Sequence, residues 1–172
     1  YTGKDWSYDA TAKVLTIAPE NPTTYDLKEC GNIRLDPKSI LCSAIIRKNA
    51  EIVNGKFWNA ENPGSSITND GTITSGVYSM PVINHGTIID GVFVSAVSNE
   101  SEGKIENGTF RSTVTNNGTI KGGIFHKKPE DGQVADGYTS KVNSQQNGSY
   151  ESFDTEISYF GNSGYVIPNS DH

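Results

Sequence analysis

The stretch TNNGTIKGGIF, from Thr115 to Phe125, decides the fold because the chain contains it several times in altered form. In each copy a glycine follows an isoleucine by three positions and precedes an aromatic residue by two. The pattern Ile-x-x-Gly-x-(Phe/Tyr) occurs five times, with its glycine at Gly55, Gly76, Gly91, Gly108 and Gly123. Successive glycines are 21, 15, 17 and 15 residues apart. Such self-similarity indicates a repeat architecture.

A second marker, Asn-x-Gly, lies upstream of three of these glycines. It reads Asn69-Asp70-Gly71, Asn84-His85-Gly86 and Asn116-Asn117-Gly118, and its counterparts in the fourth and first units are Ser101-Glu102-Gly103 and Lys48-Asn49-Ala50. Glycine and asparagine tolerate a positive φ, so we expect backbone turns of that kind at both markers.

The length of the unit narrows the fold class. About 15 residues are too few for a helix pair or a propeller blade, but they suit one coil of a β-solenoid. The residues between the turns are β-branched or aromatic, as in strands. The sequence therefore predicts an all-β protein, a parallel β-helix (β-solenoid) of about five short coils, with the isoleucines and aromatics in its core.

The two ends of the chain lack the repeat and are expected to cap the open ends of the solenoid with β-strands. We predict an N-terminal β cap and first coil over residues 1–45, solenoid repeats over 46–128 and a C-terminal β cap over 129–172, all in one domain. Cys30 and Cys42 are the only cysteines, and they could form a disulfide or stay as thiols.

Composition excludes several classes of partner. The 172 residues carry a formal net charge of -6, and the lysines and arginines are scattered, so nucleic acid is not expected to bind. No apolar run approaches 18 residues, so membrane insertion is not expected either. We expect a monomeric module of a larger protein.

Three segments resemble parts of known proteins. VTNNGTIKGGIF (114–125) resembles the Asn-x-Gly-Thr-Ile-x-Gly-Gly-x-Phe repeats of large surface proteins from anaerobic, often gut-dwelling, bacteria. VADGYTSKVNSQQNGSY (134–150) resembles the segment that closes such arrays, and WSYDATAKVLTI (6–17) is similar to a strand pair of the same modules. The resemblance implies an extracellular β-helical module, of which carbohydrate-binding modules and adhesin segments are familiar kinds. It implies no catalytic or binding residues, because the shared residues are turns and core.

Candidate binding residues follow from strand alternation. The residue after each core aromatic should point outward, and these residues are Trp58, Ser79, Val94, Arg111 and His126. An exposed Trp58 beside Asn59 could stack on a sugar ring, or it could instead fold under the insertion that follows it. Tyr159 and Tyr165 could form a second platform, or belong to the core of the cap. The predicted ligand-binding residues are Trp58, Asn59, Arg111, His126, Tyr159 and Tyr165.

Acidic residues were considered as metal ligands and as catalysts. Asn49, Asp70, His85, Glu102 and Asn117 share one repeat position, so Asp70, His85 and Glu102 form either a calcium site or simply a solvated corner. Asp90 and Glu106 occupy other positions, so the carboxylates do not converge as a hydrolase or lyase requires. We expect no enzyme activity and no cofactor other than this calcium alternative.

These observations predict a non-catalytic, extracellular carbohydrate-binding module that recognises a polysaccharide through exposed aromatic and polar side chains on one flank. The alternative is an adhesin or a rigid spacer segment of a bacterial cell-surface protein. A binding module should align solvent-facing aromatics on one face, whereas a spacer should bury them.

Overall fold

The structure, a computed structural model, describes residues 1–26, 43–58, 64–142 and 164–169. Within these ranges the chain forms β-strands and a single 3₁₀ turn, η2 (Asp131–Gln133), and no α-helix. The prediction of an all-β chain with parallel sheets is confirmed, and the arrangement is compatible with a β-solenoid. No helix in the described ranges is long and apolar enough to cross a membrane.

The strands form three sheets, and the chain visits the sheets in turn. Sheet A contains β1 (Trp6–Asp9), β2 (Val14–Ile17), β4 (Ser43–Ile46), β7 (Ile67–Asn69), β10 (Val82–Asn84), β13 (Val97–Asn99) and β16 (Val114–Asn116), in that order. Sheet B contains β3 (Thr23–Asp26), β5 (Ala50–Asn54), β8 (Thr72–Ile73), β11 (Thr87–Ile88), β14 (Lys104–Ile105) and β17 (Thr119–Ile120). Sheet C contains β6 (Lys56–Trp58), β9 (Val77–Ser79), β12 (Val92–Phe93), β15 (Thr109–Phe110), β18 (Gly123–Phe125), β20 (Gly164–Pro168) and β19 (Tyr138–Val142).

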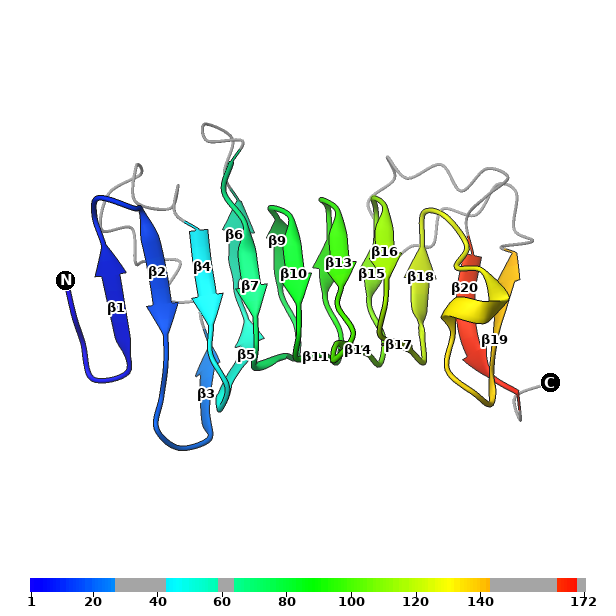
Figure 1. Ribbon diagram of the computed structural model, residues 1–172, viewed down its shortest axis with the longest axis horizontal. Helices are drawn as coiled ribbons and strands as arrows, with labels where there is room; N and C mark the ends of the chain where they lie inside the picture. The colour runs from blue at the N-terminus through cyan, green and yellow to red at the C-terminus, as the bar shows by residue number, and fades with distance from the viewer. Residues whose placement is uncertain (27–42, 59–63, 143–163, 170–172) are drawn as a thin grey trace.

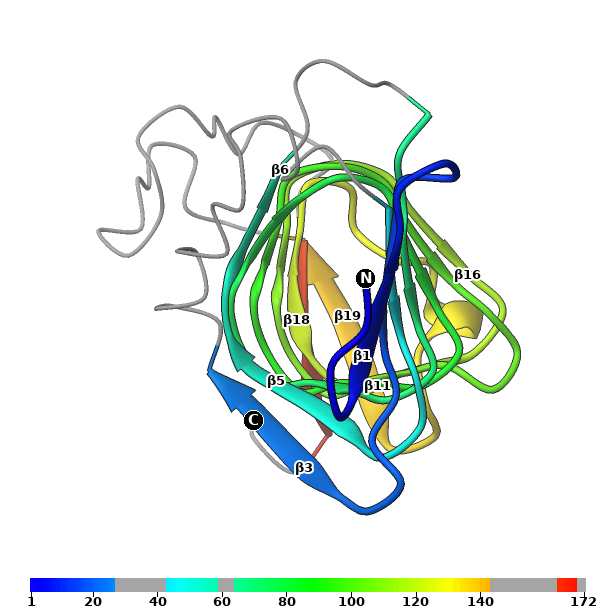
Figure 2. The same ribbon diagram turned by 90° about the vertical axis from the view of Figure 1, so that its left-hand side faces the viewer.

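One passage through sheets A, B and C is called a circuit below. Successive circuits lie side by side along the long axis of the molecule, from the N-terminus to the C-terminus (Figure 1). Viewed from one end, they wind around a common axis (Figure 2). Because each circuit pairs in parallel with the next, equivalent residues form columns parallel to this axis.

Two of these columns fill the core. Ile52, Ile73, Ile88, Ile105 and Ile120 are paired from circuit to circuit in sheet B and are at most 1% exposed. Phe57, Tyr78, Phe93, Phe110 and Phe125 stack in sheet C, with ring centroids 5.1, 5.0, 5.0 and 4.8 Å apart. The rings lie within 10° of parallel, so each aromatic covers the face of its neighbour.

A third column is polar although it is buried. The side chains of Asn69, Asn84 and Asn99 are 0% exposed, and each donates from Nδ2 to Oδ1 of the next asparagine at 2.8 Å. The last acceptor is Asn116, which in turn donates to the carbonyl of Gln133 at 2.7 Å. This asparagine ladder satisfies the amide groups that burial would otherwise leave unpaired.

The ladder corrects the sequence alignment of two repeats. Asn99, not Ser101, pairs with Asn84 and Asn116, so the fourth unit has two extra residues between Asn99 and Gly103. In the first unit Ile46 is the partner of Asn69, and the marker asparagine is absent. Because strand pairing fixes the columns, the extra residues widen the corner and leave the core unchanged.

The two marker glycines have different roles. Gly91, of the Ile-x-x-Gly pattern, has a φ of 138° as predicted, and a Cβ there would lie 3.2 Å from the Phe93 ring. Gly86 has no positive φ, and the prediction of one was wrong. It is instead a point of close approach, where a Cβ would lie 2.1 Å from the carbonyl oxygen of Gly71 in the previous circuit.

Antiparallel strands flank the parallel part at both ends. β1 pairs with β2 at one end, and β20 pairs with both β18 and β19 at the other. The domain boundaries predicted from the sequence at residues 45 and 128 stay a prediction.

Candidate functional site

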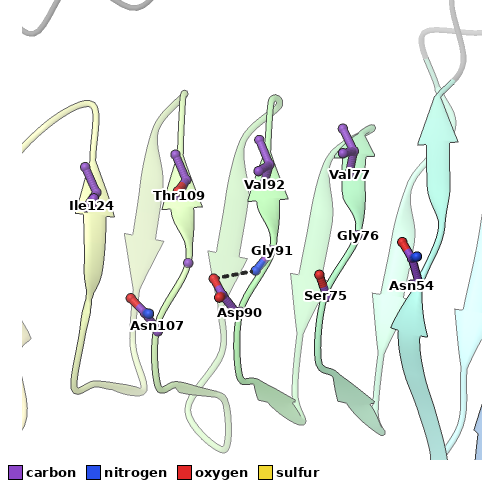
Figure 3. A pocket seen from close by; sticks show the side chains of 11 residues that line it. Asn54, Ser75, Gly76, Val77, Asp90, Gly91, Val92, Asn107, Thr109 and Ile124 are labelled. Carbon is purple, nitrogen blue, oxygen red and sulfur yellow. Dashed lines mark hydrogen bonds between the residues drawn. The ribbon is translucent and has the colours of Figure 1, made fainter. Parts of the chain in front are cut away.

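A shallow groove runs along the corner where the chain passes from sheet B to sheet C. It has a volume of about 440 Å³, and its lining residues come from five successive circuits. Figure 3 shows that its side chains form two parallel rows along the axis of the molecule. Its lining residues are Asn54, Ser75, Gly76, Val77, Asp90, Gly91, Val92, Asn107, Gly108, Thr109 and Ile124.

The first row is polar and consists of Asn54, Ser75, Asp90 and Asn107. Each of these residues directly precedes a glycine of the Ile-x-x-Gly marker. The glycines at Gly76, Gly91 and Gly108 have φ values of 124°, 138° and 142°. The turn thus places one short polar side chain per circuit at the same edge of the groove.

The second row is formed by Val77, Val92, Thr109 and Ile124, which follow the marker glycines Gly76, Gly91, Gly108 and Gly123. These residues alternate with the buried aromatics of sheet C, so their side chains lie on its outer face. The groove therefore has one hydrogen-bonding edge and one largely apolar edge.

Residues at both ends continue the second row. Lys56 pairs with Val77 at the first end and is exposed. Tyr165 pairs with Ile124 at the other end and is half-buried. Its neighbour Val166 is buried opposite Gly123, so alternation places the Tyr165 ring on the outer face beside Ile124. The predicted binding residue Tyr165 thus lies one step beyond the groove.

Among the described residues that line the groove, Asp90 alone is ionisable. Its Oδ1 accepts a hydrogen bond from the backbone N–H of Gly91 at 2.8 Å (Figure 3). This bond holds the carboxylate in one orientation, so the direction of its second oxygen, Oδ2, does not vary with rotation of the side chain. Carboxylate, amide and hydroxyl groups in this row can exchange hydrogen bonds with the hydroxyls of a ligand.

The predicted flank is adjacent to the groove but does not line it. Val94, Arg111 and His126 donate their backbone N–H groups to the core aromatics Tyr78, Phe93 and Phe110 of the previous circuit, so they occupy one column. Arg111 is half-buried and His126 is exposed. Trp58 lies in β6 at the first position of this column, opposite Ser79.

Several predicted residues fall outside the described ranges. Asn59 and Tyr159 lie there, as do Cys30 and Cys42, so neither the second aromatic platform nor the disulfide is tested. The side chain of Trp58 also lies outside what the structure describes, so its predicted exposure is not tested. Among the described side chains, the exposed aromatics are Tyr1 and Trp6, near the N-terminal end.

The corner predicted as a possible calcium site contains a different set of residues from Asp70, His85 and Glu102. Asp70 and His85 do meet, with Oδ1 and Nδ1 3.0 Å apart, but Arg47 lies 3.3 Å from the other carboxylate oxygen. Because the fourth unit has two extra residues, Glu100 rather than Glu102 follows His85 in this column. In the described part of the chain, no three histidine, cysteine or acidic side chains group as metal ligands. The Arg47 guanidinium would also repel a cation.

The sequence analysis did not identify the groove. It assigned no role to the position before each marker glycine, although Ser75, Asp90 and Asn107 are all polar there. A systematic comparison of that position across the repeats would have revealed the row. Comparison of the chain with protein-family models, curated proteins and solved structures finds no match.

Proposed function

We propose that this chain is a non-catalytic, extracellular carbohydrate-binding module that holds a polysaccharide in the groove between sheets B and C. In this proposal the fold is a β-solenoid of about five coils closed by β caps. The groove carries the proposal, because its polar row and its apolar row run side by side over three circuits and the apolar row continues to Tyr165. The extracellular location rests on the resemblance of the repeats to those of bacterial surface proteins.

The chemistry of the two rows suits sugars. A pyranose ring has hydroxyl groups at its edge and C–H groups on its faces. The hydroxyls would exchange hydrogen bonds with Asn54, Ser75, Asp90 and Asn107, while the C–H faces would pack on Val77, Val92 and Ile124. The Tyr165 ring would stack on a sugar at the end of the groove.

The proposal excludes hydrolysis for a physical reason. Glycoside hydrolysis ordinarily requires two carboxyl groups on either side of the scissile bond. In the part of the chain that the structure describes, Asp90 is the single carboxylate that lines the groove. A bound polysaccharide would therefore be held without being cleaved.

Affinity electrophoresis through gels that contain single plant or host polysaccharides tests this function. We expect one or more polysaccharides to retard the protein, and the variants Asn107→Ala and Tyr165→Ala to lose most of the retardation. Thr115→Ala, an exposed change on sheet A, is the matched control and should migrate like the unchanged protein. If retardation survives in both groove variants but is lost in Trp58→Ala or Arg111→Ala, the binding site lies on the adjacent flank that contains these two residues.

The alternative function, an adhesin or rigid spacer, is favoured by one observation. The aromatic column is stacked in the core, and the exposed aromatics among the described side chains, which do not include Trp58, lie at the N-terminal end. A spacer predicts no retardation by any polysaccharide and no change in mobility for any groove variant. The same electrophoresis therefore separates the two functions.

A further inference from the structure

We infer that the groove selects a linear, uncharged polysaccharide, which lies parallel to the long axis with one sugar per circuit, and that Asp90 determines this selectivity. The inference rests on the proposed function and specifies its ligand class. Two observations support it: the distance between successive circuits and the charge of the residues that line the groove.

The spacing of the circuits sets the ligand geometry. Ring centroids of the aromatic column, just inside the groove, repeat every 4.8–5.1 Å, as expected for strand stacking. An extended chain of β-1,4-linked pyranoses advances by about one ring length per residue, which matches this repeat. Helically coiled α-1,4 glucans advance by a shorter distance per sugar, so their successive sugars would not stay aligned with successive residues of the polar row. Three circuits thus offer one polar and one β-branched contact per sugar, while the circuits at the two ends contribute Asn54 alone and Ile124 alone.

The charge of the groove sets the ligand class. A polyanionic glycan needs lysine or arginine beside each carboxylate or sulfate. The lining residues include Asp90 and no basic residue. Lys56 lies one step beyond the groove, and Lys121 lies 3.9 Å from the carboxylate of Glu106. With a net charge of -6 for the whole chain, the potential at the groove disfavours anions.

Asp90 lies in the middle of the polar row, between Ser75 and Asn107 (Figure 3). Because Gly91 fixes its carboxylate, Asp90 can accept hydrogen bonds from sugar hydroxyls without losing much side-chain freedom. The same carboxylate would face the acid group of a uronic acid residue bound at this position. A like-charge contact near a protein surface costs more than the about 1 kcal/mol that it costs in bulk water, and about 1.4 kcal/mol already weakens binding tenfold.

Isothermal titration calorimetry with matched oligosaccharides tests the inference. The probes are β-1,4-linked gluco- and manno-oligosaccharides of two to six residues, and oligomers of the same linkage that carry a carboxylate at C6. We expect affinity for the neutral oligomers to rise with each sugar and to level off at about five, one for each circuit that lines the groove. We expect the carboxylated oligomers to bind at least about tenfold more weakly.

The variant Asp90→Asn keeps the size of the side chain and removes its charge. We expect it to bind the carboxylated oligomers severalfold more tightly than the unchanged protein does, while its affinity for the neutral oligomers falls or stays the same. Ser75→Ala is the matched control, because it removes a hydrogen bond from the same row without changing the charge. Circular dichroism of each variant verifies that the fold is retained.

The outcomes distinguish this inference from the function on which it rests. Equal or tighter binding of the carboxylated oligomers overturns the selectivity, although carbohydrate binding would stand. An affinity that does not grow beyond the disaccharide overturns the lengthwise placement. If these oligomers fail to bind while another polysaccharide retards the protein, the ligand class is wrong. Absence of binding to every glycan removes the proposed function and the inference together.

Discussion

Asn84 shows how a polar residue can stabilise the interior of this molecule. Its Nδ2 donates to Asn99 at 2.8 Å and to the carbonyl of Gly86 at 3.1 Å, while its Oδ1 accepts from Asn69. Each bond links one circuit to the next or closes the corner of its own circuit. The side chain is therefore both buried and fully used.

Replacing Asn84 by alanine should lower the free energy of unfolding by about 2 kcal/mol, because the amides of Asn69 and Asn99 each lose a buried partner. Urea denaturation measures this loss. The control Asn117→Ala alters an exposed asparagine of the same motif, and we expect it to stay within about 0.5 kcal/mol. Equal effects in the two variants would contradict the role of the ladder.

Tyr78 gives a prediction that depends on pH. It is the only tyrosine in the aromatic column, and its hydroxyl donates to the carbonyl of Ser75 at 2.8 Å. Burial raises the pKa of this hydroxyl well above its ordinary value. In the unfolded chain this hydroxyl loses its proton near pH 10, whereas in the folded protein it is still protonated at that pH.

Above about pH 10 the free energy of unfolding should fall by roughly 1.4 kcal/mol per pH unit through this group alone. Tyr78→Phe removes this dependence and costs about 1 kcal/mol at pH 8, where only the hydrogen bond to Ser75 is lost. The stability difference between the two proteins should thus shrink above pH 10 and reverse near about pH 11. Urea denaturation at several pH values checks this, and a constant difference would disprove it.

At the scale of strands and corners, close approach of the backbone decides which residues are tolerated. The Asn-x-Gly corners of successive circuits stack so tightly that Gly86 has no room for a side chain against the Gly71 carbonyl. The wider corner of the fourth unit has two extra residues and still returns the chain to the same register at Lys104. Corner length can vary, whereas the glycine that ends the corner cannot easily be replaced.

Gly86→Ala should destabilise the protein by about 2–3 kcal/mol, because its methyl group would overlap the neighbouring backbone. Gly132→Ala is the control, since no atom lies within 4 Å of a Cβ at that position. Thermal and urea unfolding of the two variants provide the comparison. A similar loss at both sites would show that lost glycine flexibility, rather than the clash, is responsible.

The existence of the isoleucine and aromatic columns could be predicted from the sequence. Which residue of each repeat belongs to the asparagine column could not. The spacing of isoleucine, glycine and the aromatic residue fixed the core because these residues recur within one short motif. The asparagine column was misassigned in the fourth unit because Ser101-Glu102-Gly103 mimics the marker, and only strand pairing shows that Asn99 occupies the position. The groove was missed because its two rows become a surface only when the circuits are stacked.

At the scale of the whole molecule, the stability should depend on the number of circuits, because each circuit contacts mainly its neighbours. Duplication of residues 77–91 inserts 15 residues, the spacing between Gly76 and Gly91. We expect this longer protein to gain one strand in each sheet, to lengthen by about 4.8 Å and to unfold at a higher urea concentration. Small-angle scattering and urea denaturation measure the two effects.

A duplication of the same segment without Ile83 is the control. One missing residue in β10 reverses the inward and outward side chains of the following strand, so the extra circuit cannot join the columns. We expect this 14-residue insertion to lower the stability. If it stabilised the protein as much as the 15-residue insertion does, the register of the strands would not determine how the circuits stack.

The two extra residues of the fourth unit show where this molecule could accept foreign sequence. Ser101 and Glu102 are exposed, and the chain returns to register at Gly103 behind them, with the Asn99 ladder position intact. A loop that leaves and re-enters at such a corner does not disturb the core. Peptide epitopes inserted between Ser101 and Glu102 would therefore be displayed at one corner of the fourth unit, at a defined position along the long axis.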